Sequence, residues 1–408
     1  MQLLPHQIAA FDFFTKRARA CLFDQAGVGK TPPTVLAIAA MGLPAIIVAP
    51  ALAIGVWVRH FAEWAPEYQV VVQRTTKPIA PPEGKVVVIT TYDRVRVTQP
   101  ARFGVVLDES HLVKNERTAR AKRAQAVIQA GRSYAWALTG DPILRYPDDL
   151  WGQLVVLGIA AQTYRTKTAF CKAFGGVYGM NGMEWDAKRI KKSAYDPIKN
   201  YYLRRLRSEV MELPERTSEE WWVELPKRLG ARFADIVARY PPDSPTWEQS
   251  AAGGELAAAL ADLSAVKAEA ALKSIEELEP TPDNPVVVFA AHKDAAKIVA
   301  HAMGWPLIDG DVPNEERTAL AHAFQEGAYP GLVLTIHAGG TAITLTRAKT
   351  IVFVSEVYTP ALNAQAADRV YRFGQERAVR AIYVRAESPL EYGLQRVLKK
   401  KRPFGEIA

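Results

Sequence analysis

The sequence predicts an α/β protein with two lobes, each built on a parallel sheet, joined by a helical and basic middle segment. Over residues 1–160, strand-like and helical stretches alternate, as in a parallel sheet covered by helices. The alternation stops over 161–280 and returns over 281–408. With 408 residues, 49% of them apolar, the chain is long enough for two or three hydrophobic cores. We therefore expect lobes at 1–160 and 281–408, with 161–280 completing the first lobe and leading to the second.

Five apolar runs are the expected strands of the first lobe: ARACLFD (18–24), AIIVAP (45–50), KVVVITT (85–91), FGVVLDE (103–109) and SYAWALTG (133–140). One stretch, residues 35–58, carries no charge and is long enough to cross a bilayer. Pro44 and Pro50 interrupt it, so we expect a helix ending near Met41, the buried strand AIIVAP and a new helix from about Leu52. Neither a membrane segment nor a signal peptide is expected.

The middle segment combines helix and loop patterns with a basic cluster. It contains FGGVYGMNGMEW (174–185), a Pro/Ser/Gly-rich break over 241–254 and a helix expected over about 255–279. The formal net charge is +8, and basic residues crowd one part of this segment: Lys188, Arg189, Lys191, Lys192, Lys199, Arg204, Arg205 and Arg207. A short basic run follows at 399–402. Such clustering suits a polyanion such as nucleic acid, and a solvated basic face is the alternative.

Five runs are the expected strands of the second lobe: PVVVFAA (285–291), WPLIDG (305–310), GLVLTI (331–336), TIVFVSE (350–356) and VRAIYVRA (379–386). Near its end, NAQAADRVYRFGQ (363–375) predicts a helix closed by Phe373 and Gly374, with Arg369 and Arg372 on one face. A pair of arginines held in this way is an anion clamp. The alternative is a surface helix on which they only pair with neighbouring acids.

A strand followed by a glycine-rich loop and a helix, DQAGVGKT over 24–31, is typical of a phosphate-binding P-loop. Gly27 and Gly29 let backbone N–H groups approach a phosphate, Lys30 supplies a point charge, and the Thr31 hydroxyl can bind Mg²⁺. Asp24 occupies the first glycine position of the strict pattern, so a simple turn and helix cap is the alternative.

An apolar strand ends in adjacent carboxylates at VVLDESH, residues 105–111. Asp108 would hold the Mg²⁺ of a nucleotide, and Glu109 would polarise the attacking water. An ordinary strand end with two solvated acids is the alternative. The P-loop upstream favours the nucleotide site.

The segment LDESHLVKN (107–115) resembles the second motif of superfamily two helicase-like ATPases, in particular the Swi/Snf family of double-stranded DNA translocases. Other segments that resemble this family follow in its order, up to about residue 395: LLPHQIAAFDFF, APALAIGVWVRHFAEWAP with Trp57 and Trp64, VVVITTYDRV, ALTGDPILRYPDDLW, LRRLRSEVMELPERT, VVVFAAHKDAAKIV, LIDGDVPNEERTALAHAFQEG, VLTIHAGGTAITLTRAKTIVFVSE and QAADRVYRFGQ. VSEVYTPALNAQAADRVYRFGQ is most similar to the branch that includes fork-remodelling, strand-annealing translocases.

The resemblance implies two RecA-like lobes that use ATP with Mg²⁺. It places Gln7 at the adenine edge and Arg369 and Arg372 as arginine fingers at the γ-phosphate. The other residues that it nominates around the nucleotide are Gly27, Val28, Gly29, Lys30, Thr31, Asp108, Glu109, Gly340 and Gln375. Two departures stand out, because Asp141 replaces a threonine and Ala342 a glycine that the family usually has. We therefore expect altered coupling between ATP and DNA, with hydrolysis retained.

The resemblance also nominates residues that would contact one DNA strand: Pro50, Thr90, Thr91, His292, Lys293, Thr335 and His337. In the family such contacts are made mainly to phosphates. Each has a structural alternative, since a threonine at a strand end often caps a turn and His292 could be a satisfied loop histidine.

Together these features predict a DNA-dependent ATPase that translocates on double-stranded DNA and remodels or anneals branched DNA without conventional unwinding. The alternatives are a strand-separating helicase on the same fold, a nucleotide-gated DNA-binding switch with little hydrolysis, and a P-loop kinase, which would leave the second lobe unexplained. We also expect a monomer. Cys21 and Cys171 lie far apart in the sequence, so we expect a reducing compartment. That compartment would be a bacterial or viral-host cytoplasm, or the nucleus in a eukaryote.

Overall fold

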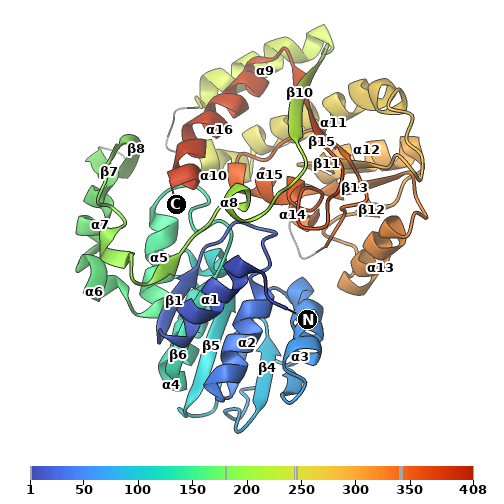
Figure 1. Ribbon diagram of the computed structural model, residues 1–408. Helices are drawn as coiled ribbons and strands as arrows, with labels where there is room; N and C mark the ends of the chain where they lie inside the picture. The colour runs from blue at the N-terminus through green and yellow to red at the C-terminus, as the bar shows by residue number, and fades with distance from the viewer. Residues whose placement is uncertain (1, 180–181, 243, 245–246, 340–342, 408) are drawn as a thin grey trace. The chain divides into compact units, whose positions relative to one another are not determined.

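The computed structural model describes residues 2–179, 182–242, 244, 247–339 and 343–407. Two compact units make up the chain, Met1–Glu212 with Phe404–Ala408 and Leu213–Pro403. Each unit contains a parallel sheet with helices packed on it (Figure 1), so the predicted α/β class is confirmed. No helix in the described part of the chain is both long and apolar enough to cross a bilayer.

The first unit is built on a sheet with the strand order β3-β4-β2-β5-β6-β1-β9. All of its strand pairs are parallel. Its central strands read as continuous apolar runs because helices cover both faces. The strands are β1 (Arg19–Leu22), β2 (Ala45–Val48), β3 (Gln69–Val72), β4 (Val86–Thr90), β5 (Phe103–Asp108), β6 (Arg132–Leu138) and β9 (Tyr202–Leu203). The uncharged stretch 35–58 forms the end of a helix, the core strand β2 and the start of another helix, as predicted.

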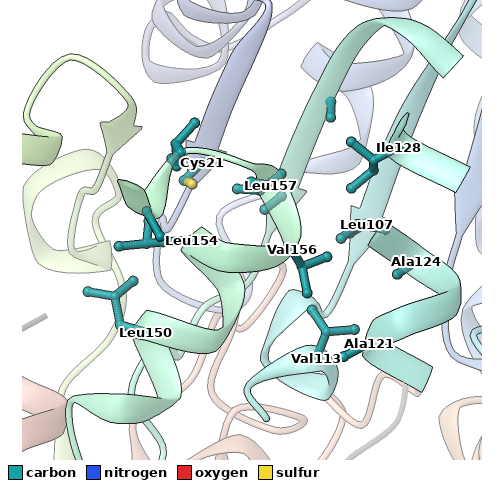
Figure 2. Close-up of a cluster of buried hydrophobic side chains, with 14 of the residues drawn as sticks. Cys21, Leu107, Val113, Ala121, Ala124, Ile128, Leu150, Leu154, Val156 and Leu157 are labelled. Atoms are coloured by element: carbon teal, nitrogen blue, oxygen red, sulfur yellow. The ribbon is translucent and has the colours of Figure 1, made fainter. Parts of the chain in front are cut away.

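Helices pack on both faces of this sheet. Figure 2 shows Leu150 and Leu154 of one helix and Ala124 of another turned toward Cys21 and Leu107 on the strands. On the other face, the Phe14 ring stacks on Trp136 of β6 with 4.5 Å between ring centroids. The helices are α1 (Pro5–Thr15), α2 (Thr31–Met41), α3 (Ile54–Trp64), α4 (Ala119–Gly131), α5 (Asp148–Leu157), α6 (Ala160–Tyr164), α7 (Lys167–Ala173) and α8 (Arg207–Val210), with 3-10 turns η1 (Ala51–Ala53), η2 (Ser110–Val113) and η3 (Asp196–Ile198).

The second unit has a parallel sheet with the strand order β10-β15-β14-β11-β13-β12. The strands are β10 (Arg216–Val223), β11 (Val286–Ala290), β12 (Leu307–Ile308), β13 (Gly331–Thr335), β14 (Thr350–Phe353) and β15 (Val379–Ala386). The five runs predicted as strands are all present. β10 was not predicted; it pairs with β15 along its whole length at the sheet edge (Figure 1).

Apolar clusters cover both faces of the second sheet as well. One contains Ala268 and Val299 with Val288, and the other contains Phe289 and Phe324. The helices are α9 (Lys227–Arg239), α10 (Trp247–Ala252), α11 (Glu255–Glu276), α12 (Lys293–Met303), α13 (Asn314–Gln325), α14 (Ile336–Gly339), α15 (Pro360–Ala367) and α16 (Pro389–Ile407).

The middle segment 161–280 is divided between the two units. It is also less helical than predicted, because it contains the antiparallel hairpin β7 (Phe174–Gly179) and β8 (Gly182–Ile190), as well as β9 and β10. Gly175 has a φ of 78°, and a Cβ there would lie 2.2 Å from the Asp186 carbonyl. Glycine in this stretch therefore lets two strands approach closely. The long helix expected from residue 255 is confirmed as α11.

Candidate active site

The P-loop connects β1 to α2 in the first unit. Gly27 and Gly29 have φ of 88° and 81°, a conformation that glycine adopts without strain. Thr31 is the first residue of α2. Because Pro32 and Pro33 carry no backbone N–H, the donor that this helix start offers beside the loop is the Thr31 N–H. Lys30 Nζ donates to the Asp24 carbonyl at 2.9 Å. The loop thus combines a held cation, glycines that let backbone N–H groups approach a ligand, and the Thr31 N–H at the helix start, features that bind phosphate.

Two side chains of α1 contact the P-loop. Gln7 Nε2 donates to the Gly29 carbonyl at 3.0 Å, and His6 Nε2 lies 2.9 Å from the Val28 carbonyl. A Cβ built at Gly29 would lie 2.6 Å from Gln7 Nε2. Gln7 is therefore fixed beside the phosphate-binding loop, while its predicted role toward adenine stays a prediction.

Asp108 ends β5 and is held by two hydrogen bonds. Its Oδ2 accepts from Trp57 Nε1 at 2.8 Å, and its Oδ1 accepts from the Glu109 N–H at 3.0 Å. Burial raises the pKa of the Asp108 carboxyl to about 6, and the Glu109 charge adds to the rise, while the Trp57 bond and the Lys30 ammonium oppose it. The strand end lies beside the P-loop, because Thr139 contacts Glu109 and a Cβ at the next residue, Gly140, would lie 2.7 Å from the Ala26 nitrogen of the loop.

Glu109 adopts a φ of 51°, which is uncommon outside glycine and recurs at functional sites. Its Oε2 accepts from the Thr139 hydroxyl at 3.4 Å and lies 3.3 Å from His111 Nδ1. The same Thr139 hydroxyl accepts from the Asp141 N–H at 3.2 Å. Sequence reasoning did not assign roles to His111 and Thr139, although both belong to the motifs DESH and LTGD.

Thr31 and Asp108 are the predicted Mg²⁺ ligands, and the donor set fits this ion. Within the described residues, no three His, Cys, Asp or Glu side chains gather as a metal-binding group. Mg²⁺ needs no such group, because it is usually held by one or two protein oxygens and by substrate phosphates. A cation would also stabilise the Asp108 carboxylate, whose charged form burial disfavours.

The two predicted arginine fingers lie in the second unit, but not on a helix. α15 ends at Ala367, so the prediction of a helix up to Gly374 is wrong. The Leu345 N–H donates to the Arg369 carbonyl at 2.8 Å, and this non-local bond fixes Arg369 in the turns that follow α15. Arg369 is buried, and Arg372 Nη1 donates to the Ile343 carbonyl at 3.4 Å. Their approach to a nucleotide stays a prediction.

Gln375 braces these turns from inside the second unit. Its Nε2 donates to the carbonyls of Thr346, Ala348 and Val370 at 3.0, 2.9 and 3.1 Å. Its Oε1 accepts from the Arg377 N–H at 3.0 Å. Both polar atoms of the Gln375 side chain thus make hydrogen bonds that stabilise these turns. Gly340 and Ala342, also singled out from the sequence, lie outside the described residues.

The DNA-facing candidates of the first unit follow the carboxyl ends of β2 and β4. Pro50 precedes η1, and Thr91 is buried just after β4. The Thr90 hydroxyl is buried and donates to Gln73 Oε1 at 2.8 Å. Thr90 therefore has a structural hydrogen bond, but to Gln73 just after β3 and not to the following turn that a capping threonine would hold.

The candidates of the second unit follow the carboxyl ends of β11 and β13. His292 and His337 line one pocket of about 360 Å³, and burial, with a smaller effect of His337, lowers the pKa of His292. Lys293 is exposed and donates to Asp311 Oδ1 at 2.5 Å, and Thr335 is buried at the end of β13. These residues thus lie at one edge of the second sheet, and their contact with DNA stays a prediction.

The basic cluster is not one surface. Lys188, Arg189, Lys191, Lys192 and Lys199 are exposed. Arg204 and Arg205 instead donate to groups at the P-loop, and Arg207 is 5% exposed. The two interpretations of the cluster, DNA contact and solvated face, therefore apply only to its first five members.

Comparison with known protein families shows which family this chain belongs to. The family model of the SNF2-related domain matches residues 6–234, more than half of the 408-residue chain. The chain belongs to the SNF2-related family. The helicase conserved C-terminal domain matches residues 267–374. The P-loop, Asp108, Glu109 and Thr139 lie in the SNF2-related domain, and Arg369 and Arg372 lie in the C-terminal helicase domain.

Curated relatives of this SNF2-related chain include the DNA annealing helicase and endonuclease ZRANB3 of Mus musculus. It is 28% identical over 436 residues, which cover 98% of this chain and 40% of the relative. The SWI/SNF-related matrix-associated actin-dependent regulator of chromatin subfamily A-like protein 1 homolog of Caenorhabditis elegans is 26% identical over 428 residues, covering 98% of this chain and 61% of the relative. The chain thus spans about two-fifths to three-fifths of these relatives.

Solved structures similar to the SNF2-related chain include the Sulfolobus solfataricus SWI2/SNF2 ATPase core. In complex with dsDNA, this core has a TM-score of 0.46 and 23% sequence identity, with 100% of this chain and 93% of that chain covered. A second solved structure, the Sulfolobus solfataricus SWI2/SNF2 ATPase core domain, has the same TM-score and identity, with 98% of this chain and 89% of that chain covered.

Proposed function

We propose that the chain is a DNA-dependent ATPase that translocates on double-stranded DNA and remodels or anneals branched DNA without conventional unwinding. The observation that carries the proposal is the assembly in one unit of Lys30, the half-buried Asp108 and Glu109. Membership of the SNF2-related family supports the ATPase. The description of a relative as a DNA annealing helicase supports the action on branched DNA.

In the proposed reaction, the P-loop N–H groups and Lys30 bind the phosphates of ATP and balance their charge. Glu109 accepts a hydrogen bond from the attacking water and orients it toward the γ-phosphate, while Thr139 and His111 fix its carboxylate. Trp57 keeps Asp108 facing the nucleotide side. Mg²⁺, held through Thr31 and Asp108, would neutralise charge on the phosphate oxygens.

We further propose that Arg369 and Arg372 of the second unit stabilise the charge that develops on the transferred phosphoryl group. ATP binding would then favour a closed arrangement of the two units, and hydrolysis would release it. Repeated closure against bound DNA would move the protein along the duplex. The Asp141 N–H, bonded to the Thr139 hydroxyl that holds Glu109, is a route by which this movement could affect the catalytic carboxylate.

The proposed partner is double-stranded or branched DNA, contacted at the carboxyl ends of the strands through Pro50, Thr91, His292, Lys293, Thr335 and His337. We propose a monomer, acting in a bacterial or viral-host cytoplasm or in a eukaryotic nucleus. These are the places where its DNA substrate is found.

The test is steady-state ATP hydrolysis without nucleic acid and with single-stranded DNA, blunt duplex, a model fork or duplex RNA. Strong stimulation by duplex or forked DNA is expected, with loss of hydrolysis in Lys30→Ala and Arg372→Ala. Triplex displacement and fork regression would then report translocation and remodelling. Displacement of a plain duplex would instead identify a strand-separating helicase, and a rate that ignores nucleic acid would overturn the motor.

A further inference from the structure

Arg205 lies against the P-loop, although its sequence neighbours suggest an exposed basic surface. Its Nε donates to Asp24 Oδ1 at 3.1 Å, and its Nη2 donates to the second Asp24 oxygen. Asp24 is 1% exposed, so this is a buried, two-pronged arginine–carboxylate pair. Such pairs fix direction as well as charge, because the planar guanidinium matches the carboxylate plane.

The third contact of Arg205 reaches the middle of the P-loop through α1. Its Nη1 donates to the His6 carbonyl, and His6 Nε2 lies 2.9 Å from the Val28 carbonyl. One guanidinium is thereby linked to the first residue of the loop, Asp24, and, through His6, to Val28. The loop is held at two points on either side of the glycine Gly27.

The backbone around Arg205 continues the parallel pairing of β1 and β9 into the P-loop. The Phe23 N–H donates to the Leu203 carbonyl at 2.8 Å, and the Gln25 N–H donates to the Arg205 carbonyl at 3.0 Å. The Arg207 N–H in turn donates to Gln25 Oε1 at 3.0 Å. The first part of the loop therefore cannot shift without moving this segment.

Arg204 extends the same link to the catalytic carboxylate. Its Nη1 donates to the Phe23 carbonyl at 3.1 Å and to the Gly140 carbonyl at 3.2 Å. Gly140 follows Thr139, whose hydroxyl donates to Glu109. A Cβ at Gly140 would lie 2.7 Å from the Ala26 backbone nitrogen, so the two loops are in close contact. Arg204 thus ties the P-loop to the segment that holds Glu109.

We propose that Arg205, paired with Asp24, is a positioning residue for the P-loop, and that it links the ATP site to the segment that leads into the second unit. The proposal rests on the proposed ATPase function. Arg205 precedes the boundary between Glu212 and Leu213 by only a few residues. A change in the loop on nucleotide binding is therefore passed directly to the chain that connects the units.

The pair also accounts for Asp24 at the first position of the P-loop pattern. A glycine there would leave the Arg205 guanidinium buried opposite no carboxylate, and an uncompensated buried charge is strongly unfavourable. Asp24 and Arg205 thus depend on each other.

The test compares Arg205→Ala, Arg205→Lys, Asp24→Asn and the double variant Arg205→Ala/Asp24→Asn in the full chain. Arg102→Ala is the matched control, because Arg102 is exposed in the same unit, one residue before β5. For each protein, kcat and KM for ATP are measured at saturating duplex DNA, with titration of a fluorescent ATP analogue and a melting curve. All kinetic assays are run well below the lowest melting temperature.

Arg205→Ala is expected to lower kcat/KM by about 10-fold to 100-fold, the range caused by misplacing a site by about 1 Å, and to weaken binding of the analogue. Arg205→Lys should recover part of the lost kcat/KM, because it restores the positive charge but not the two parallel hydrogen bonds of the planar guanidinium. The double variant should be no worse than Arg205→Ala, because the two residues act as one unit. Arg102→Ala should match the wild type.

Kinetics unchanged from wild type in a folded Arg205→Ala, with only a lower melting temperature, would overturn the positioning role and leave the ATPase proposal intact. If Arg205→Ala does not fold, wild-type kinetics in both Arg205→Lys and Asp24→Asn would overturn it equally. A wild-type chain that neither binds the analogue nor hydrolyses ATP would overturn both proposals.

Discussion

At Gly29, both space and backbone conformation exclude a side chain. The φ of 81° is strained for alanine, and the added Cβ would lie 2.6 Å from Gln7 Nε2. Gly29→Ala should therefore displace Gln7 or the P-loop and weaken binding of a fluorescent ATP analogue by at least about tenfold, equivalent to about 1.4 kcal/mol. Urea unfolding should also show a loss of about 1–3 kcal/mol from the backbone strain.

Gly42→Ala separates these two effects. Gly42 has a φ of 64°, but a Cβ there would meet nothing within 4 Å. The variant should lose stability through strain and keep its nucleotide affinity. Equal affinities for Gly29→Ala and Gly42→Ala would show that the contact with Gln7 does not shape the P-loop.

Asp148 at the start of α5 predicts a pH dependence of stability. Burial, with a smaller contribution from the Asp149 charge, raises the pKa of Asp148 from 3.8 to about 6. Between these two pH values the folded chain binds more protons than the unfolded chain, so this carboxyl lowers the free energy of unfolding as pH rises. Asp148→Asn should therefore be more stable than wild type by about 1–2 kcal/mol at pH 7.5.

The gain from Asp148→Asn should shrink toward zero as pH falls from 6 to 4, because the wild-type carboxyl is then protonated in the folded chain. Urea unfolding at pH 7.5, 6 and 4.5 measures this. Asp12→Asn, at an exposed position on α1, should show no such pH-dependent gain. A gain for Asp148→Asn that is equal at all three pH values would contradict the titration.

At the scale of elements, a buried ion pair joins α11 to α16 in the second unit. Lys267 Nζ donates to Glu391 Oε2 at 2.7 Å, and both side chains are 1% exposed. Arg385 Nη1 lies 3.4 Å from the other Glu391 oxygen. Lys267→Met should lower the free energy of unfolding by about 3 kcal/mol, because it leaves Glu391 with a single cation.

A double-mutant cycle tests this pair. Lys267→Met/Glu391→Gln removes both charges, so it should be less destabilised than the sum of the two single variants, by about 1–3 kcal/mol in urea unfolding. The exposed pair of Lys273 and Glu277 on α11, 3.9 Å apart, gives the matched control cycle, in which the coupling should stay below about 1 kcal/mol. Additive losses at Lys267 and Glu391 would show that Arg385 and Gln395, the other donors to Glu391, satisfy this carboxylate without Lys267.

The elements that the sequence predicted well are those whose burial is uniform. β2, β11 and β13 are buried at every residue, so their apolar runs end within one or two residues of the strand ends. β10 has alternating exposure and charged residues, and β7 is rich in glycine, so neither carries a strong strand signal. α15 was predicted too long, because the bond from Leu345 to Arg369 that ends its helical path comes from a distant part of the chain.

In the candidate site, too, local sequence predicts the residues of a motif but not their contacts with distant parts of the chain. Lys30, Asp108 and Glu109 follow from local motifs, and the structure packs the Thr139–Gly140 segment that holds Glu109 against Ala26 of the P-loop. Arg205 was counted with the basic cluster because its partner Asp24 lies 181 positions away. Local sequence shows charge density, but it does not show which charges a distant carboxylate removes from the surface.

At the scale of the whole molecule, the net charge of +8 predicts DNA binding that weakens with salt. Only the exposed cations can release counterions from DNA, so the relevant cluster is Lys188, Arg189, Lys191, Lys192 and Lys199 rather than Arg204 and Arg205. Its four lysines are the residues to replace. If each lysine contacts a phosphate, replacing all four with alanine should reduce the slope of log Kd against log salt by up to about 3–4, at about 0.9 for each contact. Fluorescence anisotropy with a labelled duplex between 50 and 200 mM salt, about the range over which such effects are measured, gives the slope.

Four exposed lysines of the same unit provide the control for this change: Lys16, Lys77, Lys85 and Lys122. Replacing them with alanine changes the net charge equally, so any effect of overall charge appears in both variants. Long-range attraction alone would affect both four-lysine variants equally. A larger loss of slope when Lys188, Lys191, Lys192 and Lys199 are replaced would therefore show that DNA contacts this cluster. Equal slopes would assign the cluster to solvent and leave DNA binding to the carboxyl ends of the two sheets.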